Sequence, residues 1–216
     1  SKQSSLSTDT YLTENLLLTK CDASSTVKAE TGRIAVPTTS QETALAKFRP
    51  SLDEYELMDW DDSRFAKFKP NHALHDTLYG DQKVEAYEIY KHKNKHEIFC
   101  VLKFGSRLNG YPGILHGGIS ALVLDNSYGW LFMTSGFKPA FTANLDLNYR
   151  SPIRANSFCV LRARVHEQKG RKLRMSATLE DAASGKLQVE STTLFVSPKT
   201  WADWASIESI MKFFNL

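Results

Sequence analysis

The stretch HGGISALVLDNSYGWLFMTSG, residues 116–136, decides how this chain folds. After its two glycines the stretch is apolar on nearly every side for about five helical turns, which is typical of a helix buried at the centre of a domain. One acidic residue, Asp125, lies inside it. Because an ionised carboxylate is costly in apolar surroundings unless it is paired or used, Asp125 is the residue that packing does not explain.

Strand-like segments lie on both sides of this helix. EIFCVLKFG, residues 97–105, precedes it, and four segments in which apolar and polar residues alternate follow it. Short turns join the last three, so we expect an antiparallel meander. The pattern predicts an α+β fold in which an antiparallel sheet wraps around the long central helix. The four later segments are residues 141–150, 159–166, 173–180 and 187–197.

The rest of the chain predicts further parts around this body. Residues 1–40 are rich in Ser and Thr and indicate a poorly ordered arm. Residues 41–95 contain the patches ETALAKF, SLDEYELMDW and SRFAKF and predict an N-terminal helical extension. The sheet-and-helix domain takes residues 96–198, and residues 199–216 are expected to form an amphipathic C-terminal helix.

Composition excludes several classes of protein. Lys and Arg number 27 and Asp and Glu 24, and the net charge of +3 is too small to indicate nucleic-acid binding. Cys21, Cys100 and Cys159 lie far apart and form no CxxC pair, which argues against a disulfide framework or a zinc ribbon and favours a reducing compartment. No apolar run approaches the roughly 20 residues that cross a bilayer, so we expect no stable membrane insertion.

Two groups of residues have ordinary explanations. His92 and His96 have the spacing of a metal pair but lack a third ligand nearby, so solvated surface is the favoured interpretation and no metal site is expected. The helix aromatics could line an acyl tunnel, although aromatic residues on a buried helix usually belong to the core. These aromatics are Tyr128, Trp130, Phe132 and, just after the helix, Phe137.

The start of the helix is a candidate anion site. Glycines that open a helix leave backbone N–H groups at its positive end, so Gly117 and Gly118 could hold an oxyanion. Asp125 could then act as a general base toward water or as a nucleophile. The ordinary alternatives are a tight turn for the glycines and a carboxylate hydrogen-bonded to Asn126 or Ser127.

Helix geometry adds a condition to this site. Gly118 and Asp125 are seven residues apart, about 10 Å along one helix, which is too far for both to act on one carbonyl group. We therefore expect a two-fold homodimer in which the helix start of one chain faces the Asp of its partner.

The order of motifs resembles a known family. A strand, HGGISALVLD, FTANLDLNYRSPI, KGRKLRMSATLE and ESTTLFV follow one another as in the PaaI-like hot-dog acyl-CoA thioesterases, most closely those of the mitochondrial thioesterase superfamily member 4 and 5 type. The resemblance extends from about Tyr111 to Ser197. It implies the hot-dog fold, hydrolysis of acyl-CoA to free fatty acid and CoA, no cofactor, and homodimers that can pair again. It also implies a mitochondrial location, the alternative being the cytoplasm.

The resemblance assigns roles to individual residues. Asp125 matches the catalytic carboxylate, and Gly118 with Gly117 matches the oxyanion donor. His116 matches a histidine that orients the thioester or the loop, and Thr142 matches a threonine that positions water. The positions that hold the coenzyme A moiety match Asn148, Arg150, Arg171 and Lys172.

Two other functions stay open at this point. A non-catalytic acyl-CoA-binding or scaffold protein can have the same fold, because a fold does not guarantee an activity. A hot-dog dehydratase or hydratase would act on acyl chains, and formation of an enoyl product without release of free thiol would identify it.

Overall fold

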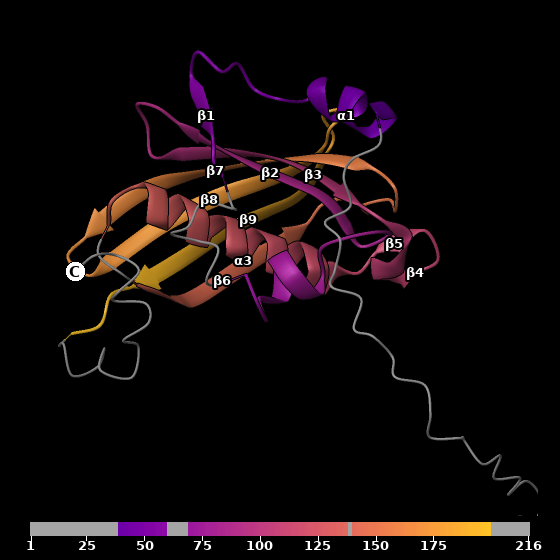
Figure 1. The fold of residues 1–216 in the computed structure, drawn as a ribbon. Helices are drawn as coiled ribbons and strands as arrows, with labels where there is room; N and C mark the ends of the chain where they lie inside the picture. The colour runs from indigo at the N-terminus through magenta and orange to yellow at the C-terminus, as the bar shows by residue number, and fades with distance from the viewer. Residues whose placement is uncertain (1–38, 60–68, 138–139, 200–216) are drawn as a thin grey trace, which may run out of the picture. The chain divides into compact units, whose positions relative to one another are not determined.

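The computed structural model describes residues 39–59, 69–137 and 140–199 (Figure 1). The expected Ser/Thr-rich arm, except for its last two residues, and the C-terminal helix, except for Lys199, lie outside the described residues, as does the patch SRFAKF.

One antiparallel sheet of seven strands forms the main body, in the order β1-β2-β3-β7-β8-β9-β6. All five strand segments predicted from the sequence are present, and the meander β7-β8-β9 is confirmed. A separate two-stranded sheet is formed by β4 (Asn109–Tyr111) and β5 (Ile114–Leu115). The seven strands are β1 (Tyr55–Leu57), β2 (Val84–His92), β3 (Glu97–Phe104), β6 (Phe141–Tyr149), β7 (Phe158–Lys169), β8 (Lys172–Asp181) and β9 (Leu187–Val196).

The helix α3 (Gly117–Thr134) runs along one face of this sheet (Figure 1). Its side chains Val123, Leu124 and Leu131 have no exposed surface, and they join the main hydrophobic core. Burying side chains of this size contributes about 1.5–3 kcal/mol each. The predicted α+β architecture with a central buried helix is therefore confirmed.

The N-terminal part corrects the sequence analysis. The structure has a helix α1 (Thr39–Ala46) and a π-helical turn η1 (Ala73–Thr77), but SLDEYELMDW contains the strand β1 and residues 84–92 form β2. The sheet thus begins upstream of residue 96. β2 escapes a search for alternating residues because it is buried on both faces, by the main core on one side and by a second cluster with α1 on the other.

Four consecutive residues of α3 hydrogen-bond to four different elements. Asp125 accepts a hydrogen bond from β6, and Asn126 reaches His75 of η1. Ser127 shares a hydrogen bond with Tyr87 of β2, and Tyr128 donates to the Ser191 carbonyl of β9. These residues, 125–128, form a polar belt that fixes the helix against the surrounding elements.

His75 makes the stability of the protein depend on pH. Burial, with His72 and Lys69 nearby, lowers its pKa to about 3, whereas the unfolded chain takes up this proton near pH 6.5. The contribution of His75 to stability is therefore complete above about pH 6.5 and is lost as the pH falls toward 3. We expect urea unfolding to show a loss of about 2 kcal/mol between pH 7 and pH 5. His75→Gln should lack this loss, and an equal loss in that variant would contradict the assignment.

Candidate functional site

Asp125 and Thr142 are brought together by α3 and β6. The Thr142 Oγ1 hydroxyl donates to Asp125 Oδ1 over 2.9 Å. The pairing of β6 with β9 shifts register between Thr142 and Asn144, and such bulges often redirect a side chain beside a functional site. Asp125 is half-buried in the single chain, less than the sequence suggested.

The ordinary alternative for Asp125 does not match this geometry. The side chain of Asn126 bonds to His75 and to Tyr87, and that of Ser127 bonds to the Val123 carbonyl and to Tyr87. Both neighbours therefore direct their side chains to other elements, and the Asp125 carboxylate is oriented by Thr142 instead.

His116 caps the start of α3. Its Nδ1 accepts the N–H of Gly118 over 2.9 Å, so the ring nitrogen presents its lone pair to the start of the helix. The N–H of Ile119 donates to the His116 carbonyl. Among the described residues the structure gives no acceptor for the N–H of Gly117. Of the two predicted oxyanion donors, Gly117 is the one whose amide is not already used within the helix cap.

Both glycines of this motif lie close to a neighbouring side chain. A Cβ on Gly118 would lie 3.1 Å from His116 Nδ1, and a Cβ on Gly117 would lie 3.3 Å from the Tyr149 hydroxyl. Tyr149 donates its hydroxyl to the Gly117 carbonyl over 2.9 Å. The sequence analysis missed Tyr149, although it lies between Asn148 and Arg150, which were both named as site residues.

A pocket of about 590 Å³ opens at this end of α3. Tyr111 and Tyr149 form part of its lining and are 78% and 56% exposed. Arg150 also lines the pocket and pairs with Glu190, with 2.8 Å between Arg150 Nη2 and Glu190 Oε2. Other lining residues are Gly110, Ile114, His116, Gly117, Ser120 and Pro152.

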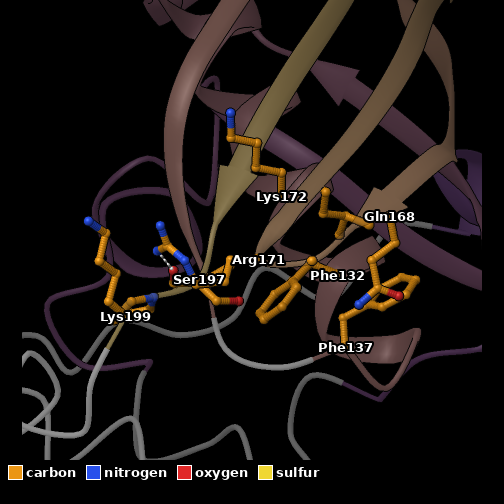
Figure 2. Close-up of a pocket in the computed structure, with 11 residues that line it drawn as sticks. Phe132, Phe137, Gln168, Arg171, Lys172, Ser197 and Lys199 are labelled. Carbon is orange, nitrogen blue, oxygen red and sulfur yellow. Dashed lines mark hydrogen bonds between the residues drawn. The ribbon is translucent and has the colours of Figure 1, made fainter.

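A second pocket, of about 480 Å³, lies at the other end of α3. Figure 2 shows the charged ends of Arg171 and Lys199 on the same side of the pocket, with the side chains of Phe132 and Phe137 also in its lining. Arg171 Nη1 donates to the Ser197 carbonyl. Lys172 also lines this pocket, whereas the aromatic residues Tyr128 and Trp130 are fully buried core. The sequence analysis missed Gln168 of β7 and Lys199, which follows β9.

The predicted residues form two separate sets on the single chain. The sheet register places Thr142 beside Phe195 and Leu173, next to Arg171 and Lys172. It places Tyr149, beside Asn148 and Arg150, in a row with Val189 and Leu179. Six residues of β8 and of β9 separate these rows, or about 20 Å. Asn148 hydrogen-bonds Asp146 rather than any member of the first set.

Other chemically active side chains are accounted for by packing. His92 is buried and its Nδ1 accepts the N–H of Asn94, so the expectation that it lies on the solvated surface is wrong. Burial raises the pKa of Cys100 and of Cys159 to about 12, which makes both thiols unreactive.

Within the described ranges no group of three or more His, Cys, Asp or Glu is placed to hold a metal ion. No helix in the same ranges is long and apolar enough to span a membrane.

Comparison with other sequences points to one family. The sequence pattern of the family described as Thioesterase superfamily matches residues 112–187. Acyl-coenzyme A thioesterase THEM4 of Rattus norvegicus is 32% identical over 110 residues, which are 51% of this chain and 47% of that protein. The chain thus spans about half the length of this relative. A protein of Candida albicans named uncharacterized and mitochondrial is 27% identical over 177 residues, covering 73% of this chain and 78% of that one.

Comparison with solved structures agrees on the fold. A thioesterase superfamily protein aligns with a TM-score of 0.51 and 25% identity, covering 73% of this chain and 74% of that chain. The predicted hot-dog fold and the predicted resemblance to thioesterases are both confirmed.

Proposed function

We propose that this chain, whose residues 112–187 match the thioesterase superfamily, is an acyl-CoA thioesterase that hydrolyses acyl-CoA to a free fatty acid and CoA. The observation that carries the proposal is the hydrogen bond from Thr142 to Asp125, which orients a half-buried carboxylate beside an open strand. A carboxylate held in this way is suited to activate water.

The reaction needs three groups from the chain. Asp125 takes a proton from a water molecule while the water oxygen attacks the thioester carbon. The carbonyl oxygen becomes negative and accepts a hydrogen bond from the Gly117 N–H at the positive end of α3. The carbon–sulfur bond then breaks, the proton held by Asp125 passes to the leaving thiolate, and the acid and free thiol depart. His116 holds the Gly118 amide and so fixes the turn that presents Gly117.

The edge strand β6 supports the proposed homodimer. β6 has one neighbour, β9, in the described sheet, and most of its residues are exposed. It carries the exposed aromatic rings of Phe141 and Tyr149. An unpaired strand edge is a template for pairing with another chain, and pairing by a second copy would extend the sheet across a two-fold axis.

Pairing of two β6 strands would assemble the site. An antiparallel pair centred on Leu145 puts Thr142 beside the partner subunit's Asn148. Asp125, bonded to Thr142, would then face the partner subunit's Gly117, which is bonded to Tyr149. The same pairing brings the row that contains Lys172, with Arg171 before it, to the same end of the composite site as the partner subunit's Arg150, with β9 and β6 between them. One dimer would contain two such composite sites.

We assign the coenzyme A phosphates to these cations, since Arg offers a planar fork and Lys a point charge to phosphate. The double variant R171A/K172A should raise the KM for acyl-CoA about tenfold, from the loss of about 1.4 kcal/mol of binding. It should leave kcat unchanged. The control substrate is the acyl-pantetheine thioester, which lacks the nucleotide and its phosphates. The KM for this substrate should be the same in the double variant and the wild type. An equal rise of KM for both substrates would contradict the assignment.

The name of the Candida albicans relative supports a mitochondrial location for this chain, which imaging of the tagged full-length protein would test.

The decisive experiment measures release of free thiol from short, medium and long acyl-CoA. Hydrolysis that depends on chain length would support the thioesterase and name its substrate class. Binding of acyl-CoA without thiol release would instead favour a binding or scaffold protein, and an enoyl product would favour a hydratase.

A further inference from the structure

The side of α3 that faces away from β6 is held by a buried histidine. His75 is 6% exposed and stacks on the Tyr87 ring, with 5.4 Å between centroids. Its Nε2 faces Asn126 Nδ2 at 3.1 Å and accepts the Trp130 Nε1–H over 3.5 Å. Both N–H donors belong to α3 and are four residues, or one helical turn, apart. One nitrogen atom thus holds two successive turns of the helix.

The turn that carries His75 is itself well fixed. His72 Nδ1 accepts the backbone N–H groups of Leu74 and His75 over 3.1 and 3.2 Å. Leu74 has no exposed surface and lies in the main core. The Asn126 amide also donates to the Tyr87 hydroxyl over 3.3 Å, so β2 supports the same contact.

We propose that His75 is a positioning residue that sets the rotation of α3 and thereby the direction of the Asp125 carboxylate. Asn126 directly follows Asp125, and the contact with His75 opposes rotation of the helix away from Thr142. A rotation of 10° about the helix axis moves a group about 5.5 Å from that axis by about 1 Å. A misplacement of this size is enough to reduce a reaction rate by about a hundredfold.

This role belongs to a segment outside the thioesterase match. η1 spans Ala73–Thr77, whereas the family pattern begins at residue 112. The N-terminal part would therefore act on the active site without touching the substrate. The inference rests on the proposed function for its kinetic test, but the effect on the helix can be measured without any activity.

The test compares two replacements of similar size. His75→Met removes the acceptor, whereas His75→Gln keeps an acceptor oxygen near the position of Nε2. We expect His75→Met to lower kcat about tenfold with KM changed less than twofold, and His75→Gln to stay within about twofold of the wild type in both. Leu74→Val is the matched control, because it weakens the same turn without touching the belt.

The outcomes separate positioning from simple stabilisation. Each variant is assayed well below its own melting temperature. The proposal is overturned if Leu74→Val lowers kcat as much as His75→Met, or if His75→Met and His75→Gln behave alike. If the wild type hydrolyses no acyl-CoA, the proposed function fails, and amide hydrogen exchange of residues 122–130 decides the positioning role. Faster exchange in His75→Met than in His75→Gln supports the role, and equal exchange overturns it.

Discussion

Asp125→Asn is expected to fold, to bind acyl-CoA, and to lose turnover by about 10²–10⁴-fold, the usual contribution of a general base. Asparagine has the same shape and can still accept the Thr142 hydroxyl through its side-chain oxygen, so the local structure is retained. It cannot take a proton from water at neutral pH. The loss should therefore appear in kcat, whereas the dissociation constant for acyl-CoA should stay within about threefold.

The measurement is thiol release under saturating acyl-CoA, with binding measured separately by calorimetry. The matched control is Asp181→Asn, because Asp181 bonds Ser184 in the turn between β8 and β9, away from the proposed site. Turnover of this control should be unchanged. Asp125→Asn that retains full turnover would refute the catalytic role.

Isotope labelling separates the two roles that the sequence left open for Asp125. A single turnover in water labelled with ¹⁸O puts the label into the fatty acid if Asp125 acts as a base. If Asp125 attacks the thioester itself, an anhydride forms, and water that adds to its Asp125 carbonyl leaves the label in the Asp125 carboxylate. Label in Asp125 would therefore identify the nucleophile, whereas water that adds to the acyl carbonyl labels the fatty acid in either mechanism. We expect the base, because Thr142 holds one oxygen of the Asp125 carboxylate and leaves the other to take a proton from water.

The sequence predicted the parts of the fold that one physical pattern controls. The helix from Gly117 has an apolar composition on all sides, and the last three strands alternate with short turns, so both were found. β2 was missed because burial on both faces removes the alternation. The surface position expected for His92 was wrong because its ring is buried beside Tyr55, whereas His96 is exposed as expected. Contacts between distant segments leave no local pattern that a sequence search can find.

The residues of the site also fall into those that a local sequence pattern reveals and those that only the folded chain reveals. The sequence alone reveals the two glycines and Asp125, because a buried helix with a purely structural role has no need of them. Tyr149 and His75 act through single hydrogen bonds to residues 32 and 51 positions away, so only the folded chain identifies them. Gly117 is the preferred oxyanion donor because His116 Nδ1 already accepts the N–H of Gly118. This contact depends on the rotamer of His116, which the sequence does not reveal.

Mixing two inactive variants is expected to restore activity. Asp125→Asn removes the base, and Gly117→Val puts a branched side chain at the oxyanion donor, where even a Cβ lies 3.3 Å from Tyr149. Each homodimer should be inactive. If each site takes Asp125 from one chain and Gly117 from the other, a mixed dimer contains one intact site and one with both defects. Random mixing makes about half of the dimers mixed, so about a quarter of wild-type activity should return.

The restored activity depends on where the two groups come from. If one chain supplied both Asp125 and Gly117 to the same site, every site in every mixed dimer would carry one defect and no activity would return. Co-expression of the variants with different tags and two-step purification isolates the mixed dimer, whose activity should be about half that of the wild type. Asp146→Pro, within the edge strand β6, should weaken pairing of the two strands and abolish this restoration, because proline lacks a backbone N–H and bends the strand. Circular dichroism of the Asp146→Pro variant checks that the single chain still folds. If the mixed dimer recovers activity and Asp146→Pro abolishes that recovery, then the reaction depends on pairing of the two edge strands.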